Sequence, residues 1–509
     1  MSAHPRRPAV PARSLADLAT RAGLLIPQSD VTVTGVTLDS HSVTPGDLFA
    51  ALPGAHAHGA DHLVEAIARG AVATLTDARG AARAAELGLP ALVAADPRSV
   101  LGMVAAEVFG NPAEDLMMLG VTGTNGKTTA TWLLESGARA CDQRTGLIGT
   151  VTTRIGEVTL PAVRTTPEAP DLQALLARMR EAAVDCVAME VSSHALAQGR
   201  VDGVQFDVAA FTNLTQDHLD FHGDMEHYFA AKAELFTPAR ARSSVVVVDD
   251  VWGRRLAECS SIPVITVSAT GDRSAADWTG SATRSRADGG TDLVAHGPGN
   301  LTLDLSVRLP GRYNVTNALT ALAVLAGAGL DPVTAATGIG ACPGVPGRLE
   351  SIDRGQPFLV VVDYAHTPDA VAGVLAALRD GLSGRLLAVV GAGGDRDRDK
   401  RPLLGSAAAQ GADVVWVTDD NPRREDPAAI RAAVLSGALE TATRSGATVI
   451  EMGDRRAAIA AAIREAQVGD VLVVAGKGHE TGQEVGGVVH PFDDRVVVVE
   501  ELAARGARP

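Results

Sequence analysis

Short runs of apolar, mostly β-branched residues recur through the first hundred residues and are separated by Gly, Pro and Asp. The runs span residues 31–38, 48–52, 71–76 and 91–94. Apolar runs of this length between turn residues are typical of strands. We therefore expect a small α/β domain over residues 14–112, ending at Asn111-Pro112 because a helix is disfavoured before proline.

The middle of the chain alternates apolar runs with longer helical patterns. Strands are predicted at 116–122, 184–191, 208–212 and 245–248, and helices at 128–139 and 171–183. This alternation favours a largely parallel sheet with crossover helices. The polar, Gly-rich stretch 274–299 is expected to be a hairpin or a loop, and the Ala-rich stretch 318–330 a buried helix.

A stretch dense in Pro and Gly, 343–347, separates a central domain (113–346) from a third domain (347–509). In the third domain, apolar runs again alternate with helical segments, at 358–362, 385–390, 414–418, 449–452 and 471–474. The expected fold is therefore α/β in three domains: a small N-terminal domain, a central domain with a parallel sheet, and a C-terminal Rossmann-like domain. A length of 509 residues fits this number, at roughly 150 residues per domain.

Composition narrows the possible functions. The net charge is −15 and no basic tract stands out, which argues against a nucleic-acid groove or an anionic membrane surface. No apolar run reaches the roughly 18 residues that a membrane span needs. The four cysteines lack paired spacing, so a reducing cytoplasm is expected. Residues 1–13 are rich in Pro and Arg without an apolar segment, and they predict a disordered tail.

Lysine is scarce in this chain. Among 45 Lys and Arg residues only Lys127, Lys232, Lys400 and Lys477 are lysines. Lysine differs from arginine in its compact ammonium, its easily shifted pKa and its modifiable amine. Three of the four stand in glycine-rich or charged loops, where sites are commonly built, so we favour functional roles over compositional drift.

A glycine-rich turn between a predicted strand and a predicted helix is the clearest candidate site. It comprises Gly123, Thr124, Asn125, Gly126, Lys127, Thr128 and Thr129. Backbone N–H groups and a helix N-terminus there suit nucleotide phosphates. Lys127 would reach the β- and γ-phosphates of ATP, and the Thr128 hydroxyl would bind Mg²⁺. The central domain is therefore expected to be a P-loop ATPase domain with a parallel sheet. The loop is a variant, since Val121 occupies the position where the strict pattern has glycine.

Two further strand ends carry polar residues. Glu190 ends the apolar run 184–191, where a carboxylate could hold Mg²⁺ or cap the next turn. The stretch 213–218 also follows a strand, and His218, Asp220 and His222 could be metal ligands or solvated loop residues.

Five motifs in order resemble those of the Mur ligases, ATP-dependent cytoplasmic enzymes of peptidoglycan synthesis. They are Gly-Thr-Asn-Gly-Lys-Thr-Thr (123–129), Glu-Val-Ser-Ser-His (190–194), Asn-Leu-Thr-Gln-Asp-His-Leu-Asp (213–220), Gly-Arg-Tyr-Asn (311–314) and Asp-Tyr-Ala-His-Thr-Pro (363–368). The resemblance extends from Asp39 to Glu480 and is strongest to the ligases that add meso-2,6-diaminopimelate to UDP-MurNAc-L-Ala-D-Glu. It implies catalytic roles for Lys127, Glu190, His218 and Lys232, with Lys232 carbamylated to support a second Mg²⁺.

The resemblance also assigns substrate contacts. For UDP-MurNAc-dipeptide these are Leu38, Ser40, Ala55, His56, Ala57, Thr165, Thr166, Ser192, Gln198 and Arg200, and for the nucleotide Asn317 and Arg348. For diaminopimelate they are Arg396, Asp420, Asn421, Pro422, Arg423, Gly476 and Glu480. Two arginines suit the second carboxylate of diaminopimelate, although Arg423 could also be a solvated loop residue. The chain departs from the family at His41, where arginine is frequent, and at Arg164, where asparagine is frequent.

The expected chemistry is phosphorylation of the D-Glu γ-carboxylate by ATP, followed by attack of the diaminopimelate amine on the acyl phosphate. His194 and His366 are candidate bases. A folylpolyglutamate synthase and a catalytically inactive nucleotide-binding scaffold are the alternatives. The sequence does not determine the oligomeric state, for which we expect a monomer.

Overall fold

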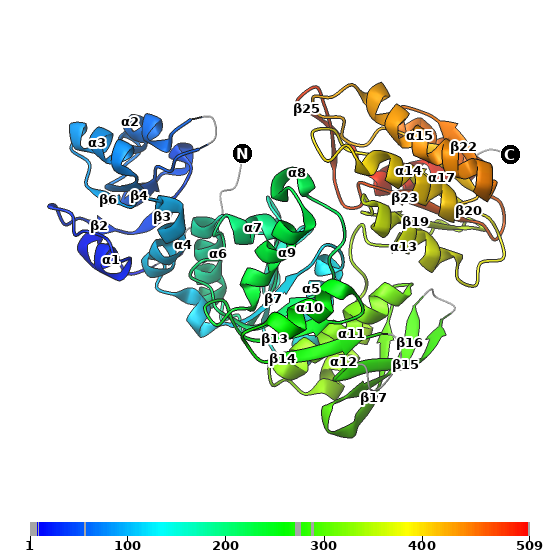
Figure 1. Cartoon of the computed structure of the whole chain (residues 1–509), viewed down its shortest axis with the longest axis horizontal. Coiled ribbons are helices and arrows are strands. Elements are labelled where there is room, and N and C mark those ends of the chain that lie inside the picture. The colour runs from blue at the N-terminus through cyan, green and yellow to red at the C-terminus, as the bar shows by residue number, and fades with distance from the viewer. Residues whose placement is uncertain (1–7, 9, 55–56, 270–275, 287–289, 507–509) are drawn as a thin grey trace.

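The computed structural model describes residues 8, 10–54, 57–269, 276–286 and 290–506. Three domains follow one another along the chain, and the central domain lies between the other two (Figure 1). Among the described helices, none is long and apolar enough to cross a membrane. Of the expected tail at 1–13, Val10 packs on the N-terminal core and Arg13 pairs with Val33.

The N-terminal domain is built on a parallel sheet of four strands, in the order β3-β4-β5-β6. Its strands are β3 (Gly35–Thr37), β4 (Asp47–Ala50), β5 (Ala73–Thr76) and β6 (Ala91–Val93), beside the short pair β1 (Arg13–Ser14) and β2 (Thr32–Val33). Its helices are α1 (Leu15–Arg21), α2 (Leu63–Ala68), α3 (Ala78–Glu86) and α4 (Pro97–Val108). All four predicted strand runs are therefore present.

The central domain has an eleven-stranded sheet, in the order β10-β9-β8-β11-β7-β12-β13-β14-β15-β16-β17. The strands from β8 to β15 are parallel, whereas β9–β10 and β16–β17 extend the two edges as antiparallel strands. The prediction of a largely parallel sheet is confirmed, and the hairpin or loop expected at 274–299 contains the antiparallel pair of β15 and β16. The strands are β7 (Met117–Thr122), β8 (Thr145–Ile148), β9 (Thr152–Ile155), β10 (Val158–Pro161), β11 (Cys186–Glu190), β12 (Phe206–Phe211), β13 (Ala241–Val247), β14 (Val264–Ser268), β15 (Trp278–Ser285), β16 (Thr291–Gly297) and β17 (Leu301–Val307).

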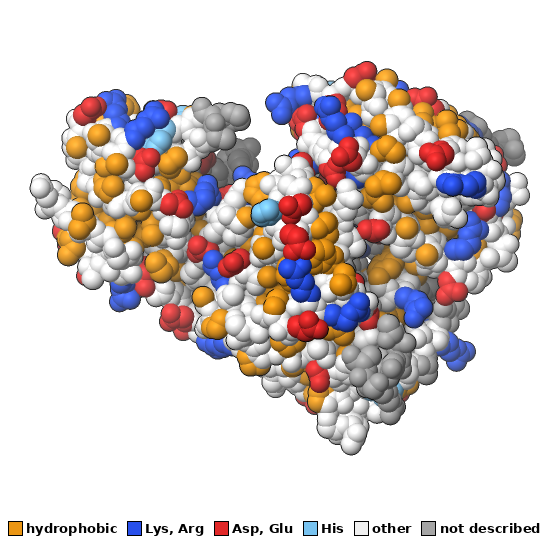
Figure 2. Space-filling view, viewed as in Figure 1, with side chains coloured by type: hydrophobic (Ala, Val, Ile, Leu, Met, Phe, Trp, Pro, Cys, Tyr) orange, Lys and Arg blue, Asp and Glu red, His pale blue; other side chains and the backbone are white. Residues whose placement is uncertain are grey.

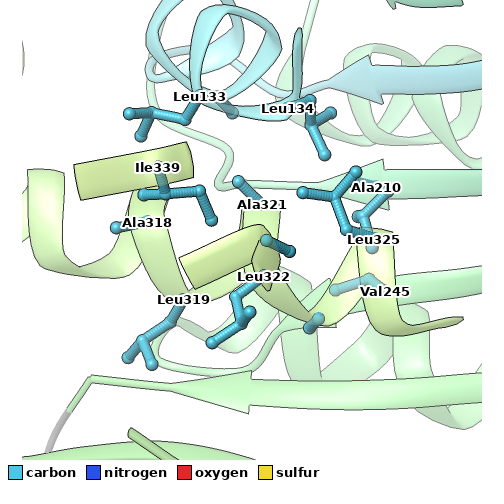
Figure 3. Packing of buried hydrophobic residues seen from close by; sticks show 14 of the residues in the cluster. Leu133, Leu134, Ala210, Val245, Ala318, Leu319, Ala321, Leu322, Leu325 and Ile339 are labelled. Atoms are coloured by element: carbon cyan, nitrogen blue, oxygen red, sulfur yellow. The ribbon is translucent and has the colours of Figure 1, made fainter. Parts of the chain in front are cut away.

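Helices cover both faces of the central sheet, so its middle strands are apolar on both sides. In β7, Leu119 and Val121 contribute to the core on one face and Met118 to the core on the other. On the first face, Leu319, Leu322 and Leu325 of α11 pack near α5, α12 and the sheet (Figure 3). The helices are α5 (Lys127–Ala140), α6 (Ala169–Glu181), α7 (Ser193–Ala197), α8 (Leu219–His222), α9 (Met225–Ala233), α10 (Val251–Cys259), α11 (Arg312–Gly327) and α12 (Pro332–Ala341).

The C-terminal domain has a six-stranded sheet in the order β18-β19-β23-β20-β21-β22, parallel except for β18. The strands are β18 (Glu350–Ser351), β19 (Leu359–Asp363), β20 (Leu386–Val390), β21 (Val414–Val417), β22 (Thr448–Glu451) and β23 (Val471–Ala475), followed by the hairpin β24 (Gly482–Val485) and β25 (Val488–Pro491). The helices are α13 (Pro368–Arg379), α14 (Lys400–Gly411), α15 (Pro427–Ser445), α16 (Arg455–Glu465) and α17 (Asp494–Gly506). This is the expected Rossmann-like arrangement.

The surface is hollowed between the N-terminal and C-terminal domains, above the central domain (Figure 2). In open α/β sheets, ligands bind beyond the carboxyl ends of the strands. The loop after β7 and the residues that follow β11, β12, β21 and β23 are all at such ends. The fold therefore brings the sequence motifs of two domains toward a common region.

Candidate active site

The glycine-rich turn joins β7 to α5, as the sequence predicts. Gly126 has φ +89°, a left-handed conformation that favours glycine, and a Cβ there would collide with Asn317 Oδ1. The Asn125 N–H donates to Asn213 Oδ1 at 2.9 Å, so the following motif holds the turn in place. The predicted loop and Asn317 are therefore in direct contact.

A cavity of about 510 Å³ lies against this turn, between the central and C-terminal domains. Its volume falls within the range of ordinary small-molecule sites. Among the predicted residues, the lining includes the loop 124–129, Glu190, His218, Asn317 and Arg348, together with Thr165 and Ser192. His366, a candidate base, also lines it.

Lys127 Nζ folds back and donates to two loop carbonyls, Gly123 O and Thr124 O, both at 2.9 Å. Burial lowers the pKa of Lys127, and the nearby carboxylates of Glu190 and Asp217 oppose that shift. An anion in the loop would provide Lys127 with a charged acceptor in place of neutral carbonyls.

Glu190 is buried at the end of β11 and is surrounded by donors. Its carboxylate accepts from the Thr128 hydroxyl at 2.9 Å, from the Thr150 N–H at 2.7 Å and from the Thr150 hydroxyl at 3.0 Å. Arg348 donates to the same Thr128 hydroxyl at 3.1 Å. A residue of the C-terminal domain therefore contacts the glycine-rich turn. Thr128 and Glu190 form a pair of oxygen donors, the ligand type that Mg²⁺ prefers.

Lys232 is buried, and its Nζ donates to Gly123 O at 2.8 Å. Its Nζ also lies 4.7 Å from the centre of the Tyr228 ring. Burial, together with the nearby Lys127 ammonium, holds the pKa of Lys232 well below its usual range. Among the described residues, no group of three or more His, Cys, Asp or Glu side chains is arranged to hold a metal.

His218 follows β12 and contacts Asp217, with Nε2 and Oδ2 3.3 Å apart. Burial lowers the pKa of His218 to about 3, so its imidazole is neutral. Burial opposes ionisation of Asp217, but the Lys400 ammonium and the hydrogen bond from the His218 backbone N–H, 3.0 Å from Oδ1, hold the Asp217 pKa well below its usual range. Lys400 belongs to the C-terminal domain, and its Nζ lies 3.4 Å from Asp217 Oδ1.

The residues predicted for the muramoyl-dipeptide form one hydrogen-bonded network next to Glu190. Thr166 Oγ1 donates to Glu190 O at 2.8 Å and accepts from Ser192 N at 3.1 Å. Arg200 donates to Thr166 O at 3.2 Å and to Gln198 Oε1 at 2.6 Å. The hydroxyl of Thr165 lies 3.0 Å from that of Thr150.

The residues predicted for the uridine part lie in the N-terminal domain. Leu38 packs on that domain's core, and Ser40 donates to Glu65 Oε2 at 3.0 Å. Ala57 accepts from Gly54 N at 3.0 Å, while Ala55 and His56 lie outside the described residues. None of the described members lines the cavity at the glycine-rich turn, so this set is separate from it.

The residues predicted for diaminopimelate gather at the carboxyl ends of β20, β21 and β23. Asn421 Nδ2 donates to Glu480 Oε2 at 2.8 Å, and a Cβ on Gly476 would lie 2.9 Å from Asp420 Oδ2. Arg423 donates to Gly394 O at 2.6 Å. Arg396 and Arg423 both border Gly393, and the carbonyl of Pro422 abuts Gly394.

Two residues at the site received no role from the sequence. Thr150 donates twice to Glu190, and Asp217 forms the ion pair with Lys400. A signal for Thr150 is its place two residues after the apolar end of β8. Asp217 stands beside His218 in the motif 213–220, but its partner Lys400 is 183 residues away in the sequence.

A glycine-rich phosphate loop, a neighbouring pair of oxygen donors and a Rossmann-like domain that contacts both define an ATP-dependent ligase of three domains. Family models match all three: "Mur ligase family, catalytic domain" at 32–111, "Mur ligase middle domain" at 121–325 and "Mur ligase, glutamate ligase domain" at 347–478. The chain belongs to the Mur ligase family.

Individual relatives agree with this assignment. The chain is 54% identical to the UDP-N-acetylmuramoyl-L-alanyl-D-glutamate–2,6-diaminopimelate ligase of Streptomyces avermitilis, over 98% of both chains. A solved structure of a ligase with that name is 33% identical, with a TM-score of 0.66 over 98% of this chain and 100% of the other. A folylpolyglutamate synthase of Mycobacterium tuberculosis, solved with ADP and AMPPCP, is 20% identical with a TM-score of 0.59, over 80% of this chain and 95% of the other, and shares the fold.

Proposed function

We propose that this chain is the ligase that joins meso-2,6-diaminopimelate to UDP-MurNAc-L-Ala-D-Glu with hydrolysis of ATP to ADP and phosphate. The observation that carries this proposal is the similarity of 54% over 98% of the chain to a ligase named for that reaction. The gathering of Arg396, Asn421, Arg423 and Glu480 in the C-terminal domain supports it.

ATP would lie in the cavity of about 510 Å³, with its triphosphate on the loop 123–129. The loop N–H groups and the N-terminus of α5 would bind the phosphate oxygens. Lys127 Nζ would exchange its two carbonyl acceptors for phosphate oxygens. Asn317 and Arg348 would contact the nucleotide from opposite sides of the seam between the two domains.

Thr128 and Glu190 fit one Mg²⁺, because both are oxygen donors and are already 2.9 Å apart. When bound, Mg²⁺ neutralises charge on the phosphates and on the approaching carboxylate. His218 and a carbamylated Lys232 would support a second ion. The low pKa of Lys232 favours this modification, because the neutral amine is the form that reacts with CO₂.

In the first step, an oxygen of the D-Glu γ-carboxylate attacks the γ-phosphorus of ATP, the bond to the bridging oxygen breaks, and ADP leaves. Thr165, Thr166, Ser192, Gln198 and Arg200 would hold the acid in line with that phosphorus, and Lys127 would offset the negative charges that repel each other.

In the second step, an amine of diaminopimelate attacks the acyl carbon, and phosphate leaves as the amide forms. Arg396 and Arg423 would bind the carboxylate at the other end of the amino acid, and Glu480 would accept from its ammonium. The proton released by the attacking amine needs an acceptor. His194 and His366 are the candidates, and burial lowers the pKa of both, so their imidazoles are neutral.

A phosphate-release assay tests the proposal. Release should require ATP, UDP-MurNAc-L-Ala-D-Glu and meso-diaminopimelate together, and Lys127→Met should reduce amide formation on the order of 10²-fold or more. Release that depends on folate and glutamate would support a folylpolyglutamate synthase instead. No release with any substrate would support a scaffold.

We further propose that the protein acts in the cytoplasm as a monomer, without nucleic acid.

A further inference from the structure

Lys477 is fully buried in the loop after β23, beneath the residues predicted to bind diaminopimelate. Its Nζ donates to Asn421 Oδ1 at 3.1 Å and to Glu480 Oε2 at 3.2 Å, and lies 3.7 Å from Asp420 Oδ1. Asn421 follows β21, whereas Glu480 follows β23, so one ammonium joins the ends of two strands.

This ammonium fixes the orientation of both partners. Asn421 Oδ1 accepts from Lys477 and from the Glu484 N–H at 3.0 Å, which turns the Asn421 amide nitrogen toward Glu480 Oε2. Glu480 Oε2 therefore accepts from two donors. Within the described part of the chain, Glu480 Oε1 has no donor, and the side chain is 31% exposed. One carboxylate oxygen is held in place while the other remains available to a ligand.

The charges around Lys477 also suit a cationic group. Lys477 and Arg455 face three carboxyl groups, those of Asp420, Glu480 and Asp494. Asp420 Oδ1 is buried without a hydrogen-bond partner. Burial raises the pKa of Asp420, and Arg455 and Lys477 oppose this rise. Two cations face three carboxyl groups, so one negative charge is left over when all three are ionised. An incoming ammonium at Glu480 would balance that charge.

The chain directly after Lys477 is tightly packed. Gly478, directly after Lys477, has φ +55°, and a Cβ there would lie 2.7 Å from both Gly347 O and the Tyr364 Cβ. The loop therefore turns back closely against the neighbouring segment, and the Lys477 side chain is 0% exposed. A compact ammonium suits this buried position, where it donates to Asn421 and Glu480, in a chain that otherwise uses arginine for almost every cation.

We propose that Lys477 is a positioning residue for the amino-acid substrate: it holds Asn421 and Glu480 so that Glu480 Oε1 accepts from the distal ammonium of diaminopimelate. This inference rests on the proposed function. It predicts that loss of Lys477 weakens binding of the amino acid and leaves the binding of ATP and of the UDP-linked substrate unchanged.

The test is steady-state kinetics of Lys477→Met, in which each of the three substrates is varied in turn. Because charge-assisted hydrogen bonds are lost, the KM for meso-diaminopimelate should rise roughly 10- to 100-fold. The KM values for ATP and UDP-MurNAc-L-Ala-D-Glu should stay within about twofold of wild type. A role in stability alone would instead lower the active fraction, and so reduce kcat without raising one KM selectively.

Arg456→Met is the matched control, because Arg456 is an exposed cation of the same domain that pairs with Glu500 and Glu501. It should behave as wild type. The double variant Lys477→Met/Glu480→Gln should be about as impaired as Glu480→Gln alone, since Lys477 acts through Glu480.

If Lys477→Met folds and its KM for meso-diaminopimelate equals that of wild type, the proposal is overturned. If Lys477→Met does not fold, Lys477→Gln, which keeps a donor but not the charge, takes its place in the same assay. If neither variant folds, Lys477 is structural and the proposal is overturned as well. A wild-type protein that does not use meso-diaminopimelate at all would contradict the proposed function, which is a separate outcome.

Discussion

Lys127 and Lys232 donate to the same acceptor, the carbonyl oxygen of Gly123, at 2.9 and 2.8 Å. Two ammonium groups this close repel each other, and burial makes the repulsion stronger than in water. Burial and the nearby Lys127 together lower the pKa of Lys232. Lys232 therefore becomes a neutral amine at a lower pH than an ordinary lysine. Carbamylation of Lys232 would convert the repulsion into an attraction.

Lys232 should therefore carry a carbamate that depends on dissolved CO₂. With ¹³C-labelled bicarbonate, we expect a carbamate signal in the NMR spectrum of wild type and none in Lys232→Met. Activity of Lys232→Met should fall on the order of 10²-fold. Lys232→Arg keeps a cation but cannot be modified, so it should be equally impaired. A wild-type spectrum without the signal, in protein with full activity, would contradict this assignment.

The same group affects stability without CO₂. The folded state holds the pKa of Lys232 well below its unfolded value of about 10.4, so the unfolded state binds more protons between these two values. The free energy of unfolding should therefore rise with pH through this window. In urea titrations at several pH values, Lys232→Met should show a smaller rise. If the free energy of unfolding rises equally with pH in Lys232→Met and in wild type, Lys232 is not the cause of the rise.

The close pair of Thr128 and Glu190 was predictable from the sequence, because each follows a parallel strand and such strand ends meet at one edge of a sheet. The edge strands β9 and β10 were not, since each has only four residues of mixed polarity. The hydrogen-bond partners of Lys400 and Lys477 could not be predicted from the sequence either. Both lysines were conspicuous in the sequence, but their acceptors depend on how separate segments and domains pack.

Arg423 should determine which amine the enzyme uses. Arg423→Ala should lower kcat/KM for meso-diaminopimelate by roughly 10- to 100-fold, because a carboxylate loses a charge-assisted partner. L-Lysine lacks that carboxylate, so its kcat/KM should change little. Arg424→Ala is the control, because Arg424 is the adjacent arginine, is 82% exposed and pairs with Asp395. If Arg423→Ala discriminates between the two amines as well as wild type does, the role given to Arg423 is wrong.

Arg455 and Asp494 form a fully buried ion pair below the same loops, with Nη2 and Oδ2 2.7 Å apart. Arg455 also donates to Ala475 O at 2.9 Å, directly before Gly476. Arg455→Met would leave the Asp494 carboxylate buried without its partner, and should cost about 3–5 kcal/mol of stability. Arg455→Met/Asp494→Leu should recover much of this loss. Urea unfolding measures the stability of the single and the double variant. If Arg455→Met is as stable as wild type, the prediction is wrong.

Lys400 and Asp217 link the C-terminal domain to the central domain beside His218. Both side chains are buried, and Nζ lies 3.4 Å from Oδ1. Lys400→Met would leave Asp217 without this partner and should shift the molecule toward separated domains. Removal of one member of a buried pair costs up to about 3–5 kcal/mol, which would change the population of the joined state more than tenfold.

Small-angle X-ray scattering should show a larger radius of gyration for Lys400→Met than for wild type. Arg398→Met is the matched control, because Arg398 is a 73% exposed cation of the same segment that pairs with Glu425. The low pKa of Asp217 means that the pair contributes stability above the unfolded value of about 3.9, and loses it only as pH falls through the lower folded value. The difference between Lys400→Met and wild type should therefore be constant from pH 5 to about 9. Equal radii for the two proteins would show that other contacts hold the domains together.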